Sequence, residues 1–447
     1  AKLGDLGAWT GGGTPSKSRD EFWTAGTVPW VSPKDMKSAR VGADAERITE
    51  AAVAQSAAKL VPAGSVLCVV RSGILQHTFP VAIAEQDVTL NQDMRALTPA
   101  AGVSAEYLRH YLRYRNDDIL HTCSKDGTTV ASIEQPRLHE FPVPLAPEGE
   151  RTRIVAAVNA LFEEVEAGEA ALAQAREALT QFRASLLHAA CTGALSDDAG
   201  DEWQMKPLGE LVSEKPKNGY SPKAGDNEDG TLALKLTATT AGRLILAPHA
   251  VKRLSESIPQ GSPLFLRSGD LLFQRGNTPE YVGIAAIYDG PPETYIYPDL
   301  MIRVRTPDPA LTAWVWRVAN APAGRRHMRN AASGTAGSMP KITGETVRSL
   351  PIPLPPRDEI VRLLSRIEEE LNAAEEAEAL IQAQESAAVA LRQSILHAAF
   401  TGRLVPQDPA DEPAAALLAR LRANPTTTRR PRQRRATAQP DLIETPA

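Results

Sequence analysis

The 447-residue sequence has few cysteines and few aromatic residues, and it has no long hydrophobic run. Its three cysteines, Cys68, Cys123 and Cys191, lie far apart without a CxxC pair, which excludes a disulfide-stapled scaffold. Apolar runs such as Val66–Val70 are far shorter than the roughly 20 residues that a membrane span needs. No charged-then-apolar signal segment opens the chain. Together these absences predict a protein of a reducing, cytoplasmic compartment.

The composition is that of an ordinary globular protein, with 43% hydrophobic and 23% charged residues. At roughly 100–200 residues per domain, the length predicts two to four domains. The formal net charge of −5 argues at first sight against a nucleic-acid partner. However, the negative charge lies mainly in residues 142–202 and 351–404, whereas residues 203–350 carry more basic than acidic side chains. The total charge is therefore an average over unlike parts and does not exclude DNA.

One segment of the chain occurs twice. Arg183–Leu195 recurs as Arg392–Leu404, with nine of thirteen positions identical. At the same sequence separation, the Pro-rich segment Pro142–Pro147 matches Pro351–Pro356. Chance does not hold one register over so many residues, so the chain contains two copies of one structural unit.

Apolar residues recur at spacings of three and four through residues 148–190 and 357–401. This pattern predicts two long amphipathic helices. Their equal length and register favour antiparallel packing against each other, and packing of each on a separate globular core is the alternative. The expected apolar seams are Ile154, Val158, Leu161, Val165, Gly168, Leu172, Ala175, Leu179, Phe182 and Leu186 in the first helix and Leu363, Ile367, Ala374, Ala377, Ile381, Ala388, Leu391 and Ile395 in the second.

The regions outside these helices contain short β-rich runs punctuated by Gly, Pro and Asn, together with short helical patterns. This predicts an α+β fold: two pseudo-repeated mixed α/β domains separated by two long helices packed as an antiparallel coiled coil. The expected strands are Ser65–Val70, Val81–Ala84, Leu271–Phe273, Ile284–Tyr288 and Met301–Val304, and the expected short helices are Tyr107–Tyr114 and Ala313–Val318.

The repeat also predicts the domain boundaries. The first domain covers 1–147 and its helix 148–202, and the second covers 203–356 and its helix 357–404. The remaining tail, 405–447, is expected to be largely disordered apart from a short helix at Ala414–Leu421. The counterpart of Trp203 would fall before residue 1, so the first copy is expected to be trimmed at its start.

No catalytic motif is recognisable in the sequence. It lacks the glycine loop that binds S-adenosylmethionine, and Asn277–Tyr281 is a poor imitation of the Asn-Pro-Pro-aromatic run of adenine methyltransferases. Gly11–Lys17 lacks the spacing of a phosphate-binding loop, and its proline removes one of the amides that such a loop uses. His188 and His397 have no converging metal ligands. We therefore expect a binding protein with no catalytic residue and no metal site.

Several motifs make the chain resemble the DNA-specificity subunits of Type I restriction-modification systems, from residue 3 to about residue 422. The resemblance is carried by Gly12–Lys17, Glu21–Trp23, Val28–Ser32 and Asn91–Asp93, and by two helices ending Leu-His-Ala-Ala-x-Thr-Gly. Two features depart from the family pattern, namely Asn218–Lys223 in place of Gly-Gly-Thr-Pro and the Arg-rich run at 429–435.

The resemblance implies a function. In this family two target-recognition domains each read one half of a bipartite, asymmetric site in double-stranded DNA, and two antiparallel helices set the distance between them. At 1.5 Å per residue, residues 148–190 span roughly 65 Å, or about two turns of DNA. The subunit would be non-catalytic, with no cofactor of its own and no membrane partner. Its partners would be two methylation subunits, which bring S-adenosylmethionine and flip the target adenine, and ATP-driven restriction subunits.

The expected DNA contacts follow from the resemblance and from residue type, because Arg and Lys pair with guanine and phosphate while Asn and Gln pair with adenine. Two alternatives stay open: a coiled-coil scaffold that binds only protein, and a DNA-acting enzyme with an unrecognised site. The expected contacts are Thr14, Ser16, Lys17, Lys34, Arg71, Asn91, Gln92, Lys125 and Thr128 in the first domain and Asn218, Ser221, Lys223, Lys235, Arg275, Asn277, Arg325, Arg326 and Lys341 in the second.

Overall fold

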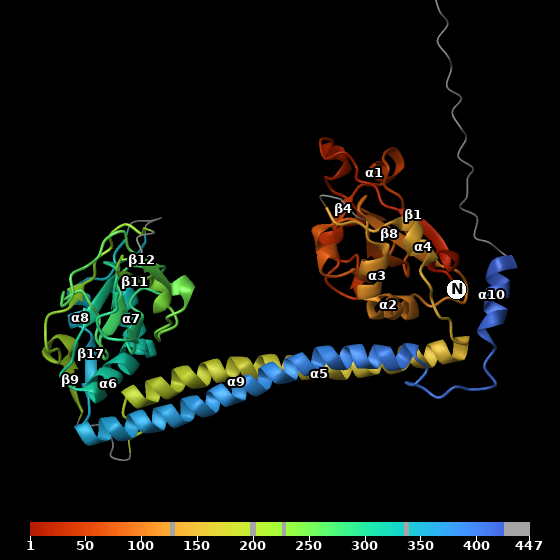
Figure 1. Cartoon of the computed structure of the whole chain (residues 1–447). Coiled ribbons are helices and arrows are strands. Elements are labelled where there is room, and N and C mark those ends of the chain that lie inside the picture. The colour runs from red at the N-terminus through yellow and green to blue at the C-terminus, as the bar shows by residue number, and fades with distance from the viewer. Residues whose placement is uncertain (126–129, 197–202, 226–228, 335–338, 424–447) are drawn as a thin grey trace, which may run out of the picture. The chain divides into compact units, whose positions relative to one another are not determined.

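The computed structural model describes residues 1–125, 130–196, 203–225, 229–334 and 339–423. The chain divides into two compact units, of which unit 1 comprises Ala1–Ala170 with Glu385–Ala447 and unit 2 comprises Ala171–Gln384. The two long helices are α5 (Glu148–Cys191) and α9 (Arg357–Phe400) (Figure 1). Each is divided between the units, with one part in unit 1 and the other part in unit 2.

Unit 1 contains a five-stranded sheet of order β1-β8-β5-β6-β3, in which only the β6–β3 pair is parallel. A smaller sheet of order β4-β2-β7 pairs β2 antiparallel with β4 and parallel with β7. The strands are β1 (Gly7–Gly11), β2 (Val28–Val31), β3 (Arg40–Val41), β4 (Glu46–Ile48), β5 (Val66–Val69), β6 (Val81–Ala84), β7 (Thr89–Leu90) and β8 (Met94–Pro99).

Unit 2 repeats this arrangement. Its main sheet has the order β10-β16-β13-β14, all antiparallel, and its smaller sheet of order β12-β11-β15 again combines one antiparallel and one parallel pair. A further pair, β9–β17, is antiparallel. The strands are β9 (Gln204–Pro207), β10 (Lys217–Asn218), β11 (Leu232–Leu234), β12 (Val251–Arg253), β13 (Leu271–Gln274), β14 (Ala285–Ile287), β15 (Tyr295–Ile296), β16 (Met301–Val304) and β17 (Pro351–Leu354).

Short helices follow the main sheet in both units and begin at polar caps. Ser104 Oγ accepts from the Tyr107 amide at the start of α2. Asp308 accepts from the Ala310 amide at the start of α6, and this cap begins the helix earlier than the apolar pattern predicts. The remaining predicted strands and helices are confirmed within a few residues. The helices are α1 (Glu50–Gln55), α2 (Ala105–Tyr114), α3 (Asn116–Cys123), α4 (Gln135–Glu140), α6 (Pro309–Asn320), α7 (Pro322–Asn330) and α8 (Gly344–Arg348).

The long helices pack antiparallel in each unit, as predicted. In unit 1 the first part of α5 contacts the last part of α9 through a buried cluster that includes Val158, Phe162 and Ile395. In unit 2 the last part of α5 contacts the first part of α9, with Leu186 and Ile367 in the core that also holds the main sheet. Each helix is therefore joined to a globular region by shared apolar contacts rather than only by the chain.

The predicted seam is wrong at four positions, because Gly168, Ala175, Phe182 and Leu391 are exposed. Phe182 and Leu391 are 41% and 50% exposed, although the spacing places both in the seam. In unit 1, Arg392 is less exposed than its neighbour Leu391, and its Nη2 lies 3.0 Å from Glu169 Oε2. Phe162 is buried where the spacing favours Leu161, which is only half-buried. A strict spacing of three and four cannot distinguish such neighbouring positions on one helix.

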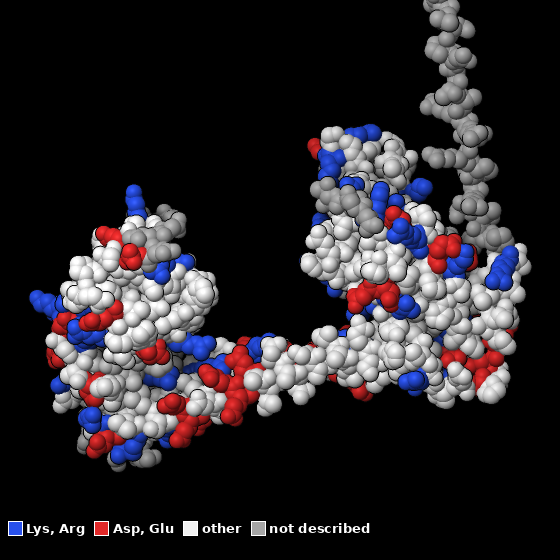
Figure 2. All heavy atoms as spheres, viewed as in Figure 1, with Lys and Arg blue, Asp and Glu red and all other residues white. Residues whose placement is uncertain are grey.

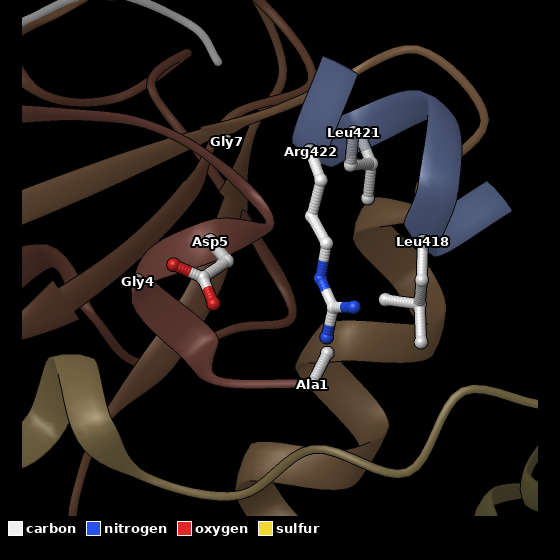
Figure 3. Close-up of a pocket in the computed structure, with 7 residues that line it drawn as sticks. All are labelled: Ala1, Gly4, Asp5, Gly7, Leu418, Leu421 and Arg422. Carbon is white, nitrogen blue, oxygen red and sulfur yellow. The ribbon is translucent and has the colours of Figure 1, made fainter. Parts of the chain in front are cut away.

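The helix expected at Ala414–Leu421 is confirmed as α10 (Ala414–Ala423), which packs on unit 1. Leu417 is 5% exposed, and Arg153 Nη2 lies 2.7 Å from Asp411 Oδ2 just before the helix. Leu418, Leu421 and Arg422 line a pocket of about 350 Å³ together with residues at the start of the chain. Figure 3 shows these three side chains beside Ala1 and Asp5. The Arg-rich run at 429–435 lies outside the described residues.

None of the described helices is both long enough and apolar enough to cross a membrane.

The α5–α9 packing predicts a stability difference between two positions of α9. Ile367 is fully buried in unit 2, whereas Leu380 on the same helix is 66% exposed. We expect Ile367→Ala to lower the free energy of unfolding by about 2–5 kcal/mol because it leaves a cavity. The matched control Leu380→Ala should change it by about 0.5 kcal/mol or less. Equal urea-unfolding midpoints for the two variants would contradict the packing.

His110 of α2 predicts how unit 1 responds to pH. It is 1% exposed, its Nε2 lies 2.8 Å from Asn159 Oδ1 of α5, and burial, aided by the charge of Arg109, lowers its pKa to about 4. An unfolded histidine binds a proton below its usual pKa near 6.5. The folded His110 does not bind this proton until the pH approaches its lowered pKa. Its contribution to the free energy of unfolding is therefore complete above about pH 6.5 and is lost as the pH falls toward the folded pKa.

We expect the wild type to lose about 2 kcal/mol of unfolding free energy from this group between about pH 7.5 and pH 5. His110→Gln, which retains an amide facing Asn159, should lack that part of the pH dependence. Urea titrations of both proteins at the two pH values measure the difference, and parallel pH profiles would show that His110 is not the group responsible.

Candidate nucleic-acid interface

The ends of four strands in unit 1 meet at one place. β1 and β5 both pair antiparallel with β8, so both end beside the residues where β8 begins. β2 and β7 run parallel and join them, because the Gly13 amide donates to Leu90 O at 2.8 Å and the Asn91 amide donates to Val31 O at 2.8 Å. We name the resulting surface loop cluster 1, formed by residues 12–17, 32–35, 70–71 and 91–93.

Most predicted contacts of the first domain lie on loop cluster 1. Lys17, Lys34, Arg71 and Gln92 are exposed, whereas Thr14 and Asn91 are partly buried. Asn91 Oδ1 accepts from the Asp93 amide at 2.7 Å, so this side chain is used in shaping the turn.

Two predicted contacts stand at the margin of this surface. Arg71 pairs through its backbone with Ser132, and the Lys125 amide donates to Ser132 O at 2.9 Å, which brings Lys125 beside the cluster. Both Arg71 and Lys125 are exposed, and neither side chain has an ion pair with another described residue. Thr128 lies outside the described residues.

Two tryptophans support the start of loop cluster 1. Trp23 Nε1 donates to Ser16 O at 3.1 Å, and Trp30 Nε1 donates to Gly13 O at 3.1 Å. Lys17 Nζ lies 4.3 Å from the centre of the Trp23 ring, where the electron-rich face attracts a cation. The indoles thus hold the glycine-rich segment and set the position of the lysine.

Unit 2 forms the same surface from equivalent strands. The Ile342 amide donates to Arg275 O at 2.8 Å, as the Ile133 amide donates to Val70 O at 2.8 Å in unit 1. The Arg275 amide donates to Leu300 O, and the Val70 amide donates to Asp93 O in the same way. Arg275 therefore occupies the position of Val70. We name residues 218–221, 275–277, 298–300 and 340–342 loop cluster 2.

Five predicted contacts of the second domain lie on loop cluster 2. Ser221 Oγ accepts from the Asp299 amide at 3.1 Å, and Arg275 Nη1 donates to Asp299 O at 3.3 Å. Lys341 forms a backbone bridge with Gly276. The members of the predicted set on this surface are Asn218, Ser221, Arg275, Asn277 and Lys341.

A buried glutamine ties a further loop to this cluster. Gln274 is fully buried, and its Nε2 lies 3.0 Å from both Leu236 O and Thr239 Oγ1, just after the predicted contact Lys235. Asn277 Nδ2 donates to Gln274 Oε1 at 2.5 Å. The buried Gln274 therefore fixes the Asn277 side chain. Lys235 Nζ donates to the His249 carbonyl at 3.2 Å.

Three other predicted contacts of the second domain are placed on other elements. Lys223 is exposed, and its carbonyl accepts from the Ser255 amide. Arg325 of α7 donates to Val282 O at 2.9 Å and Glu280 O at 2.8 Å, and burial lowers its pKa to about 10. Arg325 thus connects α7 to the chain between β13 and β14, while its neighbour Arg326 is exposed.

Sequence reasoning did not single out Glu46 or Gln274. The Glu46 carboxylate lies 3.6 Å from Lys17 Nζ and 3.8 Å from Lys34 Nζ. Glu46 is an exposed charged residue at the start of β4, but only the β2–β4 pairing brings it to these lysines. For Gln274, the sequence does offer a signal, because a polar residue stands at the end of the otherwise apolar strand β13.

Charge alone does not mark either loop cluster. Figure 2 shows basic and acidic side chains interspersed on the visible face of each globular region, with acidic atoms gathered along the part of the long helices that belongs to unit 2. Among the described residues, no group of three or more His, Cys, Asp or Glu side chains could hold a metal ion. The geometry offers paired basic and amide groups on exposed loops, which is suited to binding phosphates and base edges.

Comparison with known proteins connects this geometry to a family. The family described as "Type I restriction modification DNA specificity domain" matches residues 1–174. The Type I restriction enzyme EcoR124I/EcoR124II specificity subunit of Escherichia coli is 45% identical over 153 residues, which are 34% of this chain and 38% of that subunit's length. The EcoKI specificity subunit of Escherichia coli K12 is 26% identical over 73% of each chain.

A solved structure has the same fold. It is described as "Structural basis underlying complex assembly and conformational transition of the type I R-M system", and its TM-score is 0.70 with 19% sequence identity. The match covers 90% of this chain and 97% of the solved chain. Residues 1–174 thus match the Type I DNA specificity domain family, and the chain as a whole resembles the specificity subunits of Type I restriction enzymes.

Proposed function

We propose that the chain is the DNA-specificity subunit of a Type I restriction-modification complex and reads a bipartite, asymmetric site in double-stranded DNA. Residues 1–147 and 203–356 would serve as the two target-recognition domains, each reading one half of the site. Loop clusters 1 and 2 would contact the DNA. The likeness of residues 1–174 to the specificity domain supports this proposal.

The observation that carries the proposal is the equivalence of the two loop clusters. Their backbones meet through matching hydrogen bonds, yet the side chains differ, since the partly buried Arg275 stands where the first copy has the buried apolar Val70. Equivalent strand ends with different side chains at the same place are what two readers of different sequences require. Phosphate contacts would orient each domain, and base contacts would specify its half-site.

The proposed partners are two methylation subunits and, in a complete complex, ATP-driven restriction subunits. S-adenosylmethionine would be bound by the methylation subunits, so this chain would be non-catalytic and act in the cytoplasm, where its DNA substrate lies. We propose that the methylation and restriction subunits dock on the acidic, exposed faces of α5 and α9. Residues 148–202 and 357–404 would also set the spacing between the half-sites.

Two other functions predict different results with purified protein. A scaffold that binds only protein would give a complex with the methylation subunit that shows no sequence preference on DNA at about 0.1 M salt. An enzyme acting alone on DNA would transfer methyl groups without a partner. The equivalent loop clusters favour the specificity subunit over both.

We expect that replacing residues 203–350 by the corresponding domain of another specificity subunit changes one half of the recognised sequence and leaves the other half intact. The reason is that each loop cluster is built within its own copy of the repeat. The measurement is a map of methylated adenines in cells that express the chimera with its methylation subunit.

The matched control exchanges residues 1–141 instead and should change the other half. A chimera in which both halves change, or neither, would show that the halves are not read by separate domains.

A further inference from the structure

Glu46 faces two lysines of loop cluster 1. Its Oε2 lies 3.6 Å from Lys17 Nζ and 3.8 Å from Lys34 Nζ. The side chains of Lys17 and Lys34 are 63% and 66% exposed, and that of Glu46 is 38% exposed. Ion pairs this exposed add little to the stability of a fold. They matter more for a bound anion, because a phosphate group would meet the same two ammonium groups.

The backbone holds the three side chains close to one another. Glu46 pairs with Trp30 across β4 and β2, so strand register fixes its position. Lys17 Nζ lies 4.3 Å from the Trp23 ring centre and 5.5 Å from that of Trp30. Lys34 lies in the short helical turn that directly follows β2. The carboxylate and the two ammonium groups therefore stay close even when no ion pair is formed.

We propose that Glu46 competes with DNA phosphate for Lys17 and Lys34. The inference rests on the proposed function, because it takes loop cluster 1 as a DNA-binding surface. A carboxylate oxygen accepts the same charge-assisted hydrogen bonds from an ammonium group as a phosphate oxygen does. DNA must therefore displace the carboxylate, whose negative charge then stays beside the phosphate and repels it.

This competition weakens binding to every sequence by the same factor, because phosphates carry no sequence information. A glutamate can instead read a base by accepting a hydrogen bond from cytosine N4. That role would strengthen binding to the target only. The structure favours competition, because the Glu46 carboxylate is directed at two ammonium groups of its own domain.

The test is the variant Glu46→Gln in the complete complex with its methylation subunit. Its affinity is measured on a duplex containing the mapped target and on a duplex with both half-sites scrambled. We expect both dissociation constants to fall by about fivefold at about 0.1 M salt. The dependence of log K on log salt should become steeper, by up to about 0.9 for each additional phosphate that the lysines neutralise.

Glu50→Gln is the matched control, because it removes the same charge from an exposed residue of α1 that has no ion pair with another described residue. It should leave both affinities nearly unchanged. The combined variant K17Q/K34Q/E46Q is compared with K17Q/K34Q, which keeps the carboxylate. Without the two lysines, removing the carboxylate should no longer increase the affinity for DNA.

Equal affinities for Glu46→Gln and Glu50→Gln would overturn the inference, and so would a loss of binding confined to the target. A wild-type complex that did not distinguish target from scrambled duplex would contradict the proposed function instead. Even then, the affinities of the two variants for the scrambled duplex would decide the role of Glu46.

Discussion

Apolar packing between α5 and α9 is the contact on which the rest of the structure depends. Unit 1 is assembled from two segments of chain, Ala1–Ala170 and Glu385–Ala447, and the second segment returns because residues such as Ile395 bury themselves against Val158 and Phe162. In unit 2 the same kind of contact joins Leu186 and Ile367 to the core of the main sheet. Without this packing, unit 1 would lose the part of α9 that also contacts α2.

The two copies show how one repeated scaffold carries two different loop surfaces. Strand order and hydrogen bonds at the strand ends are shared, so the position of each loop cluster is fixed by the repeat. Exposed side chains on the loops beyond those ends, such as Lys17, Lys34 and Lys341, are free to differ between the copies. Loop cluster 1 combines lysines with Glu46 and a tryptophan support, whereas in loop cluster 2 Arg275 donates to Asp299 O and Asn277 donates to the buried Gln274.

Much of the fold could be predicted from the sequence because its signals are local or repeated. The repeat of Arg183–Leu195 at Arg392–Leu404 indicates two copies and two equal helices, and short apolar runs locate the central strands. The exposed Phe182 and Leu391 could not be foreseen, because spacing alone does not say which of two neighbouring helix positions faces a partner. Pairing within the small sheets is non-local, and it is this pairing that brings Glu46 to Lys17.

The proposed DNA contacts were predicted from residue type and resemblance, and for most of them exposure on loops is what the structure adds. Asn91, Asn277 and Arg325 make internal hydrogen bonds that residue type does not reveal. These contacts favour a role in shaping the loops over direct base contact, while Arg71 and Lys125 stay available to DNA.

The central proposal is that the paired helices would set the spacing between two separate DNA readers, and one measurement tests it most directly. Seven residues would be inserted into each helix, after Ala170 and after Gln384, which preserves the heptad spacing and adds roughly 10 Å of helix. A map of methylated adenines should show the same two half-sites with an unspecified spacer longer by about three base pairs. An unchanged spacer, or altered half-site sequences, would contradict the account.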